Sequence, residues 1–185
     1  MMENGFEMSF FRAPITNKVP QQTVTLAQVA QAVKSTWLKP QTAHLRLIND
    51  EAEARRYKGW QFPYVTPAGV FSYCNDASLQ RYSGVLCMDL DHLEDVTGLK
   101  SRLIADQNFR TLMAFRSPLG MGLKWFLEID LSLCGYGQWF DGVRNYLMQT
   151  YGLSTRQADA SVRNVSRACY LCHDPEVYVN LTTDK

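Results

Sequence analysis

Two aspartates, Asp89 and Asp91, follow an almost uninterrupted apolar run in the segment SGVLCMDLDHL. Side chains at positions i and i+2 of a β-strand project from the same face, about 7 Å apart along the chain. The two carboxylates would therefore lie together, and their repulsion favours a neutralising cation. Mg²⁺ or Mn²⁺ suits this site, because hard cations take carboxylate oxygens and leave positions open for phosphates. A simpler alternative is that the pair begins a loop and caps the following helix.

A glycine-containing loop, SPLGMGLKW, is the second candidate element. Gly120 and Gly122 would let backbone amides approach an anion closely. Ser117 could donate a hydrogen bond to that anion, and Lys124 would add a positive charge at the exit of the loop. The spacing does not match a Walker loop. The alternative is an ordinary connection between two strands.

The third element is the segment DASVRNVSRACYL. Asp159 could complete an acidic triad with the two earlier aspartates, while Arg163 and Arg167 could hold phosphates through bidentate hydrogen bonds. Alternatively, Asp159 and Arg163 form a surface pair at i,i+4, which would contribute only about 0.2–0.5 kcal/mol. Arg55, Arg56 and Lys58, on a charged segment, could likewise contact phosphates or form a solvated helix face.

The elements that must position these residues follow from hydrophobic periodicity and from turn residues. Thr25 and Gln28 form a capping-box pattern before a helix whose apolar stripe runs to Trp37 and stops before Pro40. Further helices are predicted at 49–60, 96–106 and 139–151, the last ended by Gly152. Strands are predicted at 8–14, 44–48, 70–74, 84–91, 111–115, 123–130, 168–171 and 177–181.

This order predicts an α+β fold, with a mixed or antiparallel sheet flanked by helices. Strand 84–91 is so apolar that we expect it to be buried on both faces and central in the sheet. The length of 185 residues fits a single domain spanning 1–185.

Composition narrows the functional classes. A formal net charge of +1 excludes a global basic field, so any binding to phosphates must be local. The chain has no apolar stretch of about 20 residues and no signal-peptide layout, which predicts a cytoplasmic protein without membrane association. The five cysteines fit reduced thiols. The sequence Cys169-Tyr-Leu-Cys172-His173 has the c-type haem spacing, but buried thiols explain it better than haem or zinc.

Several segments together resemble the archaeo-eukaryotic primase (prim-pol) superfamily, and more closely the VirE N-terminal-type domain of primase-helicase proteins from mobile elements. The matching segments are MSFFRAPITNKVPQQTVTL, VTPAGVF, YSGVLCMDLDHL, FRSPLGMGLKWFLEID and SRACYLCHDPEVYVN. The resemblance covers most of the chain. It implies that residues 1–185 form one primase-like domain, which is either the whole protein or the N-terminal part of a larger primase-helicase protein. It implies prim-pol architecture with an RRM-like core.

The resemblance also implies roles for the candidate residues. Asp89, Asp91 and Asp159 would be catalytic residues that bind Mg²⁺ or Mn²⁺. The nucleotide phosphates would bind to Ser117, Gly120, Gly122, Lys124, Arg163 and Arg167. The implied function is a metal-dependent nucleotidyltransferase in DNA replication or mobile-element maintenance, with nucleotides, single-stranded or primer-template DNA and a helicase-like domain in cis or in trans as partners. Lys124 stands where these enzymes usually carry histidine, so the alternative is a non-catalytic nucleic-acid or nucleotide-binding module.

Overall fold

The chain begins with an aromatic strand, a second short strand and a capped helix. The computed structural model describes residues 5–182. The first part of the chain contains β1 (Glu7–Phe11), β2 (Gln22–Thr25), α1 (Leu26–Lys34), α2 (Lys39–Leu45), α3 (Glu51–Gln61), β3 (Tyr64–Thr66), β4 (Gly69–Phe71), the 3₁₀ turn η1 (Asp76–Ser78) and β5 (Leu79–Tyr82). The second part contains β6 (Val85–Leu90), α4 (Val96–Ile104), β7 (Thr111–Arg116), β8 (Leu123–Glu128), α5 (Tyr136–Tyr151), the 3₁₀ turn η2 (Ala160–Val162), β9 (Cys169–Tyr170) and β10 (Tyr178–Val179).

The N-terminal sheet has the strand order β2-β1-β3-β9, and all of its pairs are antiparallel. Strand β9 comes from the C-terminal part of the chain, so the two ends of the sequence build this sheet together. Helix α1 follows β2 through the predicted capping box, in which Thr25 accepts from the Gln28 amide and the Gln28 side chain accepts from the Thr25 amide. Such a cap stabilises a helix by about 1 kcal/mol.

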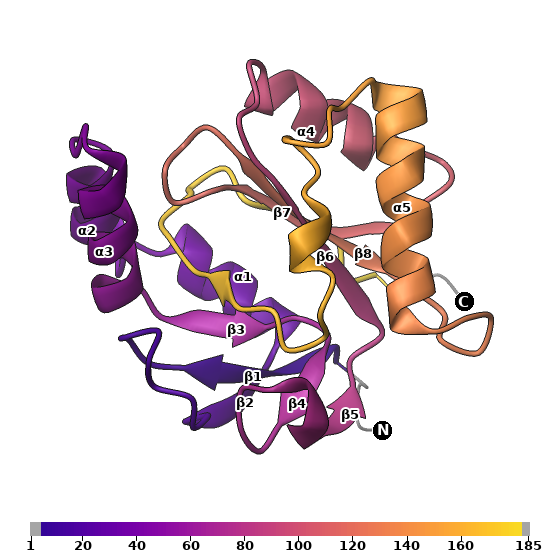
Figure 1. Ribbon diagram of the computed structural model, residues 1–185, viewed down its shortest axis with the longest axis horizontal. Helices are drawn as coiled ribbons and strands as arrows, with labels where there is room; N and C mark the ends of the chain where they lie inside the picture. Colours follow the sequence, from indigo (N-terminus) through magenta and orange to yellow (C-terminus); the bar gives the residue numbers. More distant parts are fainter. Residues whose placement is uncertain (1–4, 183–185) are drawn as a thin grey trace.

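The second sheet has the order β10-β7-β8-β6 and is also antiparallel. Helices α4 and α5 cover one face, and the N-terminal sheet with α1 lies toward the other face (Figure 1). The helix α5 ends at Gly152, which adopts the left-handed conformation with φ of 69°. This is the C-terminal signal that the sequence predicts.

Two hydrophobic clusters fill the spaces between these layers. The first joins α4 and α5 to the second sheet and includes the fully buried Trp125 and Phe140. The second joins α1, the N-terminal sheet and the opposite face of the second sheet, and includes Met8, Phe62 and Phe126. The strand β6 contributes to both clusters, because its successive side chains point to opposite faces.

The lateral position of β6 corrects one prediction. Both of its faces are covered, as its apolar sequence indicates, but it is the edge strand of its sheet and not a central one. Its outer edge is partly covered by a bridge between Leu90 and Ala158. A strand that is covered on both faces needs apolar side chains whether it lies at the centre or at the edge of its sheet. The apolar sequence of β6 therefore could not indicate its lateral position in the sheet.

Two local predictions in the first part of the chain are also wrong. The helical stripe does not reach Trp37, because α1 ends at Lys34 and Trp37 lies in the following connection with 52% of its surface exposed. The segment 44–48 is not a strand but the end of α2 and the turn after it. Pro40 occupies the first turn of α2, where its missing amide hydrogen leaves no hydrogen bond unmade.

The coarse prediction of the fold class is confirmed: the protein is α+β, with antiparallel sheets flanked by helices. The prim-pol architecture with an RRM-like core is not confirmed by this topology.

Candidate functional site

The strand β6 delivers the two aspartates of the candidate site. It ends at Leu90, so Asp89 is its penultimate residue and Asp91 the first residue beyond it. Asp89 lies opposite Lys124 of β8 in the antiparallel register. The backbone amide of Asp91 donates to the carbonyl of Gln157 over 3.1 Å. Partial burial and then the negative charge of Asp89 raise the pKa of Asp91, so the two carboxylates are electrostatic neighbours.

The side chains of Asp89 and Lys124 form an ion pair between Oδ2 and Nζ. Only 7% of the Lys124 side chain and 20% of the Asp89 side chain are exposed. Burial alone would lower the pKa of Lys124, but the Asp89 carboxylate outweighs that effect and raises it well above the usual range. Lys124 is thus held as a cation on Asp89, and its charge is not directed at the solvent.

The other oxygen of this carboxylate, Asp89 Oδ1, is buried and has no hydrogen-bond partner among the described residues. Asp89 also lines a narrow pocket with a free volume of about 10 Å³. The residues that line this pocket include Cys87, Asp89, Lys124, Arg167 and Cys169. A volume of this size holds about one water molecule or one small ion, and it does not hold a nucleotide.

The donor set around this pocket fits a hard cation in part. An unpartnered carboxylate oxygen is a suitable Mg²⁺ or Mn²⁺ ligand. Within residues 5–182, however, no group of three or more His, Cys, Asp or Glu side chains is placed to hold a metal. Asp89 and Asp91 could therefore bind an ion only if water or a bound phosphate supplied the remaining oxygens.

The loop SPLGMG lies directly against the acidic pair. A Cβ atom placed on Gly122 would lie 2.5 Å from the Leu90 carbonyl oxygen, 2.9 Å from Asp91 Oδ1 and 2.9 Å from Ser117 Oγ. Only glycine permits this approach. Three of the sequence-predicted residues, Asp91, Ser117 and Gly122, are therefore brought together, although Asp91 comes from a different segment than the other two.

The same loop is arranged differently from a phosphate-binding loop. The Ser117 amide donates to the Gly122 carbonyl over 2.8 Å, and the Gly120 amide donates to the Ser117 carbonyl over 2.9 Å. Two arginines hold the outer carbonyls: Arg46 Nε donates to Pro118 and Arg116 donates to Gly120. The amides of Ser117 and Gly120 are thus already used within the loop, and the phosphate role of this loop stays a prediction.

Asp159 and Arg163 have partners of their own. The chain runs beside β6, because Ala158 bridges to Leu90, but the Asp159 carboxylate accepts the Ser161 amide over 2.9 Å and caps η2. Arg163 forms a bidentate pair with Asp141 of α5, with N to O distances of 2.7 and 2.9 Å. A ligand role for either residue stays a prediction that would require it to leave these contacts.

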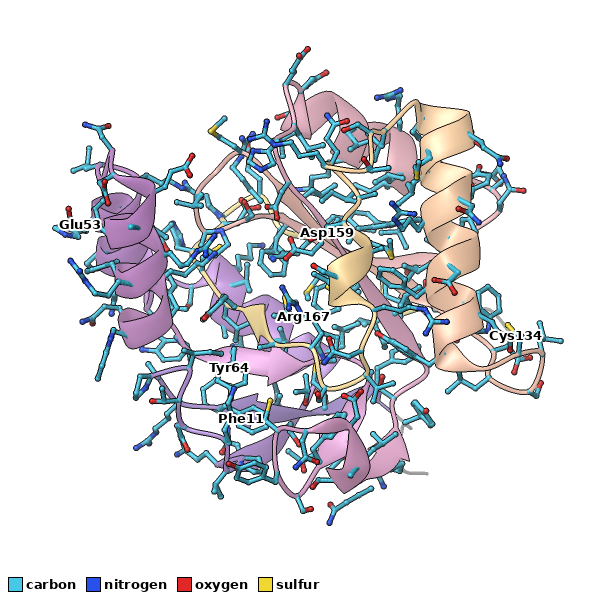
Figure 2. The ribbon with its side chains drawn as sticks, viewed as in Figure 1. Phe11, Glu53, Tyr64, Cys134, Asp159 and Arg167 are labelled. Atoms are coloured by element: carbon cyan, nitrogen blue, oxygen red, sulfur yellow. The ribbon has the colours of Figure 1, made fainter. Side chains whose placement is uncertain are left out.

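Arg167 is placed differently from Arg163. It is exposed and lies on the segment between η2 and β9 (Figure 2). It forms no ion pair with any described residue. It lines both the narrow pocket with Asp89 and a larger open hollow of about 370 Å³. We call the larger one the basic hollow, and its lining is Ile15, Lys18, Cys74, Asn164, Ser166, Arg167, Ala168 and Tyr170.

Lys18 and Tyr170 line the basic hollow, and Tyr64 and Lys58 lie beside them. Lys18 Nζ lies 5.9 Å from the ring centroid of Tyr64, and Lys58 Nζ lies 5.3 Å from that of Tyr170. The two tyrosine rings meet edge to face at 6.3 Å. Burial and then the charge of Lys124 lower the pKa of Lys58, which places this lysine near the acidic site.

The sequence offers Lys58 either as a phosphate contact or as part of a solvated helix face, and it gives no signal for Lys18. Neither residue belongs to a recognisable motif. Their proximity arises because α3 and the loop after β1 pack beside β9, which is remote in the sequence. Alternating basic and aromatic residues in a sequence can indicate a nucleic-acid-binding surface. Here the lysines and tyrosines become neighbours only in the folded protein.

The cysteine-containing segment was predicted to be structural. All five cysteines are free thiols. Cys169 and Cys172 are buried, and Cys74, Cys87 and Cys134 have intermediate exposure. Cys172 Sγ contacts the Arg116 carbonyl over 3.2 Å, and His173 Nδ1 lies 2.7 Å from the Ser35 carbonyl. These contacts agree with reduced thiols in the core.

The site thus defines an α+β domain with a buried carboxylate and ammonium pair beside a basic hollow. A family model described as the BT4734-like, N-terminal domain matches residues 58–179, a segment that contains Lys58, Asp89, Lys124 and Arg167. The chain belongs to this family. The match corrects the resemblance to the VirE N-terminal-type and prim-pol domains, which is a different family. A helicase-like partner followed from that resemblance alone and has no further support.

Comparison with curated proteins and with solved structures gives no match. Among the described residues, no helix has both the length and the apolar character needed to cross a membrane.

Proposed function

We propose that this protein is a nucleic-acid-binding module that holds single-stranded DNA at the basic hollow. The observation that carries the proposal is that Lys18 and Arg167, two cations without an ion-pair partner among the described residues, line one open hollow. Phosphates are the ligands that such cations bind in nucleic-acid complexes. A cytoplasmic location would give access to DNA and to nucleotides.

The surroundings of the hollow support a single strand in preference to a duplex. Tyr170 lines it directly, and Tyr64 lies against Tyr170. Single-strand binders combine a basic surface with aromatic rings on which bases stack, and each stacked base contributes about 1–3 kcal/mol. Asn164 and Ser166 line the same hollow, where both side chains donate to Asp76 Oδ1.

The internal ion pair explains why binding is the function that the geometry favours. The charges of Asp89 and Lys124 compensate each other, so the acidic pair would repel a nearby phosphate less than two bare carboxylates would. Lys58 adds a further positive charge on the side of α3. Lys18 and Arg167 thus bring positive charge to the hollow and Lys58 lies near the acidic pair, although the whole chain carries a charge of only +1 and the Asp76 carboxylate accepts a hydrogen bond from Ser166.

A fluorescence anisotropy titration with a labelled single strand of about 12 nucleotides tests the proposal, since single-strand binding folds cover about 4–16 nucleotides. Arg167→Met should weaken binding and reduce the slope of log K against log salt by about 0.7, the value for one phosphate contact on a single strand. Arg163→Met is the matched control, because Arg163 lies four residues away but is paired with Asp141. Equal effects of the two substitutions, or no effect of either, would refute the proposal.

A second candidate, metal-dependent nucleotidyl transfer, has one specific observation in its favour. Asp89 Oδ1 is buried without a partner and lies near the Asp91 carboxylate. When bound, Mg²⁺ or Mn²⁺ would neutralise the two aspartates and offer open positions to the phosphates of a nucleotide. In this function the two carboxylates would hold the ion, and Lys124 would remain paired with Asp89.

Extension of a primed DNA strand with Mn²⁺ and deoxynucleoside triphosphates distinguishes the two candidates. Nucleotidyl transfer predicts extension by the wild-type protein that Asp89→Asn abolishes. Asp159→Asn tests the third ligand separately, since its removal should reduce extension only if Asp159 leaves its cap on η2 to reach the ion. Tight binding of DNA without extension would leave the binding module as the function.

A further inference from the structure

A separate groove with a volume of about 700 Å³ lies on the N-terminal part of the molecule. Pro63 and Leu171 line it. Their strand neighbours Tyr64 and Tyr170 contact each other on the opposite face of the sheet, because successive side chains alternate. The groove therefore shares no lining residue with the basic hollow within the described chain. Its volume is in the range of about 300–1,000 Å³ that is typical of small-molecule sites.

Side-chain amides dominate the polar lining of this groove, which we call the amide groove. Five glutamines contribute to it: Gln21, Gln22, Gln28, Gln41 and Gln61. Gln28 uses its oxygen to accept the Thr25 amide over 2.9 Å, which leaves its NH₂ group to donate elsewhere. Gln41 Oε1 is buried and has no partner among the described residues. Such an unpaired acceptor costs free energy, and a hydrogen-bond donor on a bound ligand would relieve that cost.

Aromatic residues form part of the walls. Trp37 and Phe10 both line the groove, with ring centroids 6.4 Å apart and planes tilted by 44°. Trp37 keeps 52% of its surface exposed although it follows directly on a helix with a well-packed apolar face. A large, accessible indole beside amide groups is suited to stacking on a planar ring.

The electrostatic character of the groove limits the ligand further. Arg12 is the only charged residue among its described lining residues, and it forms no ion pair within residues 5–182. A single guanidinium suits a ligand with one anionic group. The amides, each with a donor and an acceptor, suit a ring whose edge alternates donors and acceptors. A nucleobase has such an edge, and glutamine pairs with it in protein complexes.

We propose that the amide groove binds one nucleotide, with its base stacked on Trp37 and hydrogen-bonded to the glutamines, and its phosphate on Arg12. This site is distinct from the proposed DNA contact at the basic hollow, and either one can exist without the other. Its ligand is a nucleoside monophosphate or a terminal nucleotide of the same chemistry.

Isothermal titration with the four common nucleoside 5′-monophosphates tests the proposal, with the nucleosides and inorganic phosphate as comparison ligands. The wild-type protein should bind at least one monophosphate more tightly than the corresponding nucleoside, and phosphate alone more weakly than either. Trp37→Leu should weaken binding about tenfold or more, as expected for the loss of one stacked base. Trp60→Leu is the matched control, because Trp60 is 62% exposed and does not line the groove.

Two further variants separate the parts of the site. Arg12→Gln should lower the affinity for the monophosphate to that for the nucleoside. Gln41→Met should weaken binding without lowering the thermal stability of the free protein, because it removes an acceptor that has no partner. Circular dichroism of each variant verifies that it is folded.

The proposal is overturned if no monophosphate binds at millimolar concentration, if phosphate alone binds as tightly as the nucleotide, or if Trp37→Leu and Trp60→Leu weaken binding equally. Arg167→Met acts on the basic hollow and should leave this binding unchanged. A loss of monophosphate binding in Arg167→Met would place the nucleotide at the basic hollow and overturn the assignment to the amide groove.

Discussion

The substitution Lys124→Met removes the positive charge that pairs with Asp89 and so tests the contribution of this ion pair to stability. Methionine keeps much of the volume and the apolar stem of lysine, so it removes the charge while largely preserving the packing. The change leaves the Asp89 carboxylate buried, with Oδ1 already lacking a partner and Oδ2 newly deprived of its ion pair. We therefore expect a large loss of stability from a single substitution on β8.

The magnitude follows from the burial of the pair. Removing one partner of a buried ion pair costs about 3–5 kcal/mol, whereas an exposed pair contributes about 0–1 kcal/mol. Lys124 is 7% exposed, but Asp89 retains 20% and contacts some solvent. We expect about 3 kcal/mol, the lower end of the range for buried pairs.

Urea unfolding monitored by circular dichroism measures this loss. With a slope of about 2 kcal/mol per molar urea, a loss of 3 kcal/mol would lower the midpoint by about 1.5 M. In the Asp89→Asn background the same Lys124→Met substitution should cost less than about 1 kcal/mol, because no buried carboxylate remains. A midpoint shift typical of a surface pair, or additive effects in the double mutant, would show that the two charges are not coupled as described.

Four other predictions concern two glycines, one carboxylate and one buried hydrogen bond. Gly122→Ala should lower stability by about 1–3 kcal/mol, because its Cβ would lie 2.5 Å from the Leu90 carbonyl oxygen. Gly142→Ala, in α5 with no atom within 4 Å of the new Cβ, should raise stability by about 0.5–1 kcal/mol; similar melting temperatures for the two variants would contradict the geometry. Burial alone would raise the pKa of Asp76, but hydrogen bonds from Ser166 outweigh it and hold the pKa below 3.8, so the stability that Asp76 contributes is present above pH 3.8 and lost as the pH falls through its folded pKa. Asp76→Asn should therefore lose less stability than the wild type in acid unfolding, and an identical acid dependence would refute that role. Thr111→Val should cost about 1–3 kcal/mol in thermal unfolding, because it leaves the buried Trp125 Nε1 without its 2.8 Å acceptor, and an unchanged melting temperature would contradict it.

The sequence predicted helices and strands correctly where interactions between residues close in the chain decide the structure. The capping box at Thr25, the stop at Gly152 and the apolar strands β7 and β8 all depend on residues within one or two turns or one strand. The extent of α1 and the strand at 44–48 were wrong locally, and the position of β6 was wrong because a distant segment decided it. Burial of β6 was correct, but its edge position depends on which strands pair beside it.

The candidate site shows the same division. The i and i+2 spacing alone indicated that Asp89 and Asp91 would be neighbours. That Lys124 neutralises Asp89 depends on the register between β6 and β8, because directly opposed residues in an antiparallel pair have adjacent side chains. The same motif could have left Lys124 free for a phosphate if the register had differed by one residue.

The sequence by itself determined the α+β class, the approximate positions of α1, α3, α4, α5, β6, β7 and β8, and the presence of two adjacent carboxylates, because these follow from periodicity and local hydrogen bonding. It did not predict β2, α2, β3 or β5. The tertiary structure alone decided which cations have partners. It paired Arg163 with Asp141 and Lys124 with Asp89, and it left Arg167 and Lys18 together in one hollow. Charges separated by tens of residues acquire their partners only when the chain folds, because electrostatic interactions depend on distance in space and not on distance in sequence.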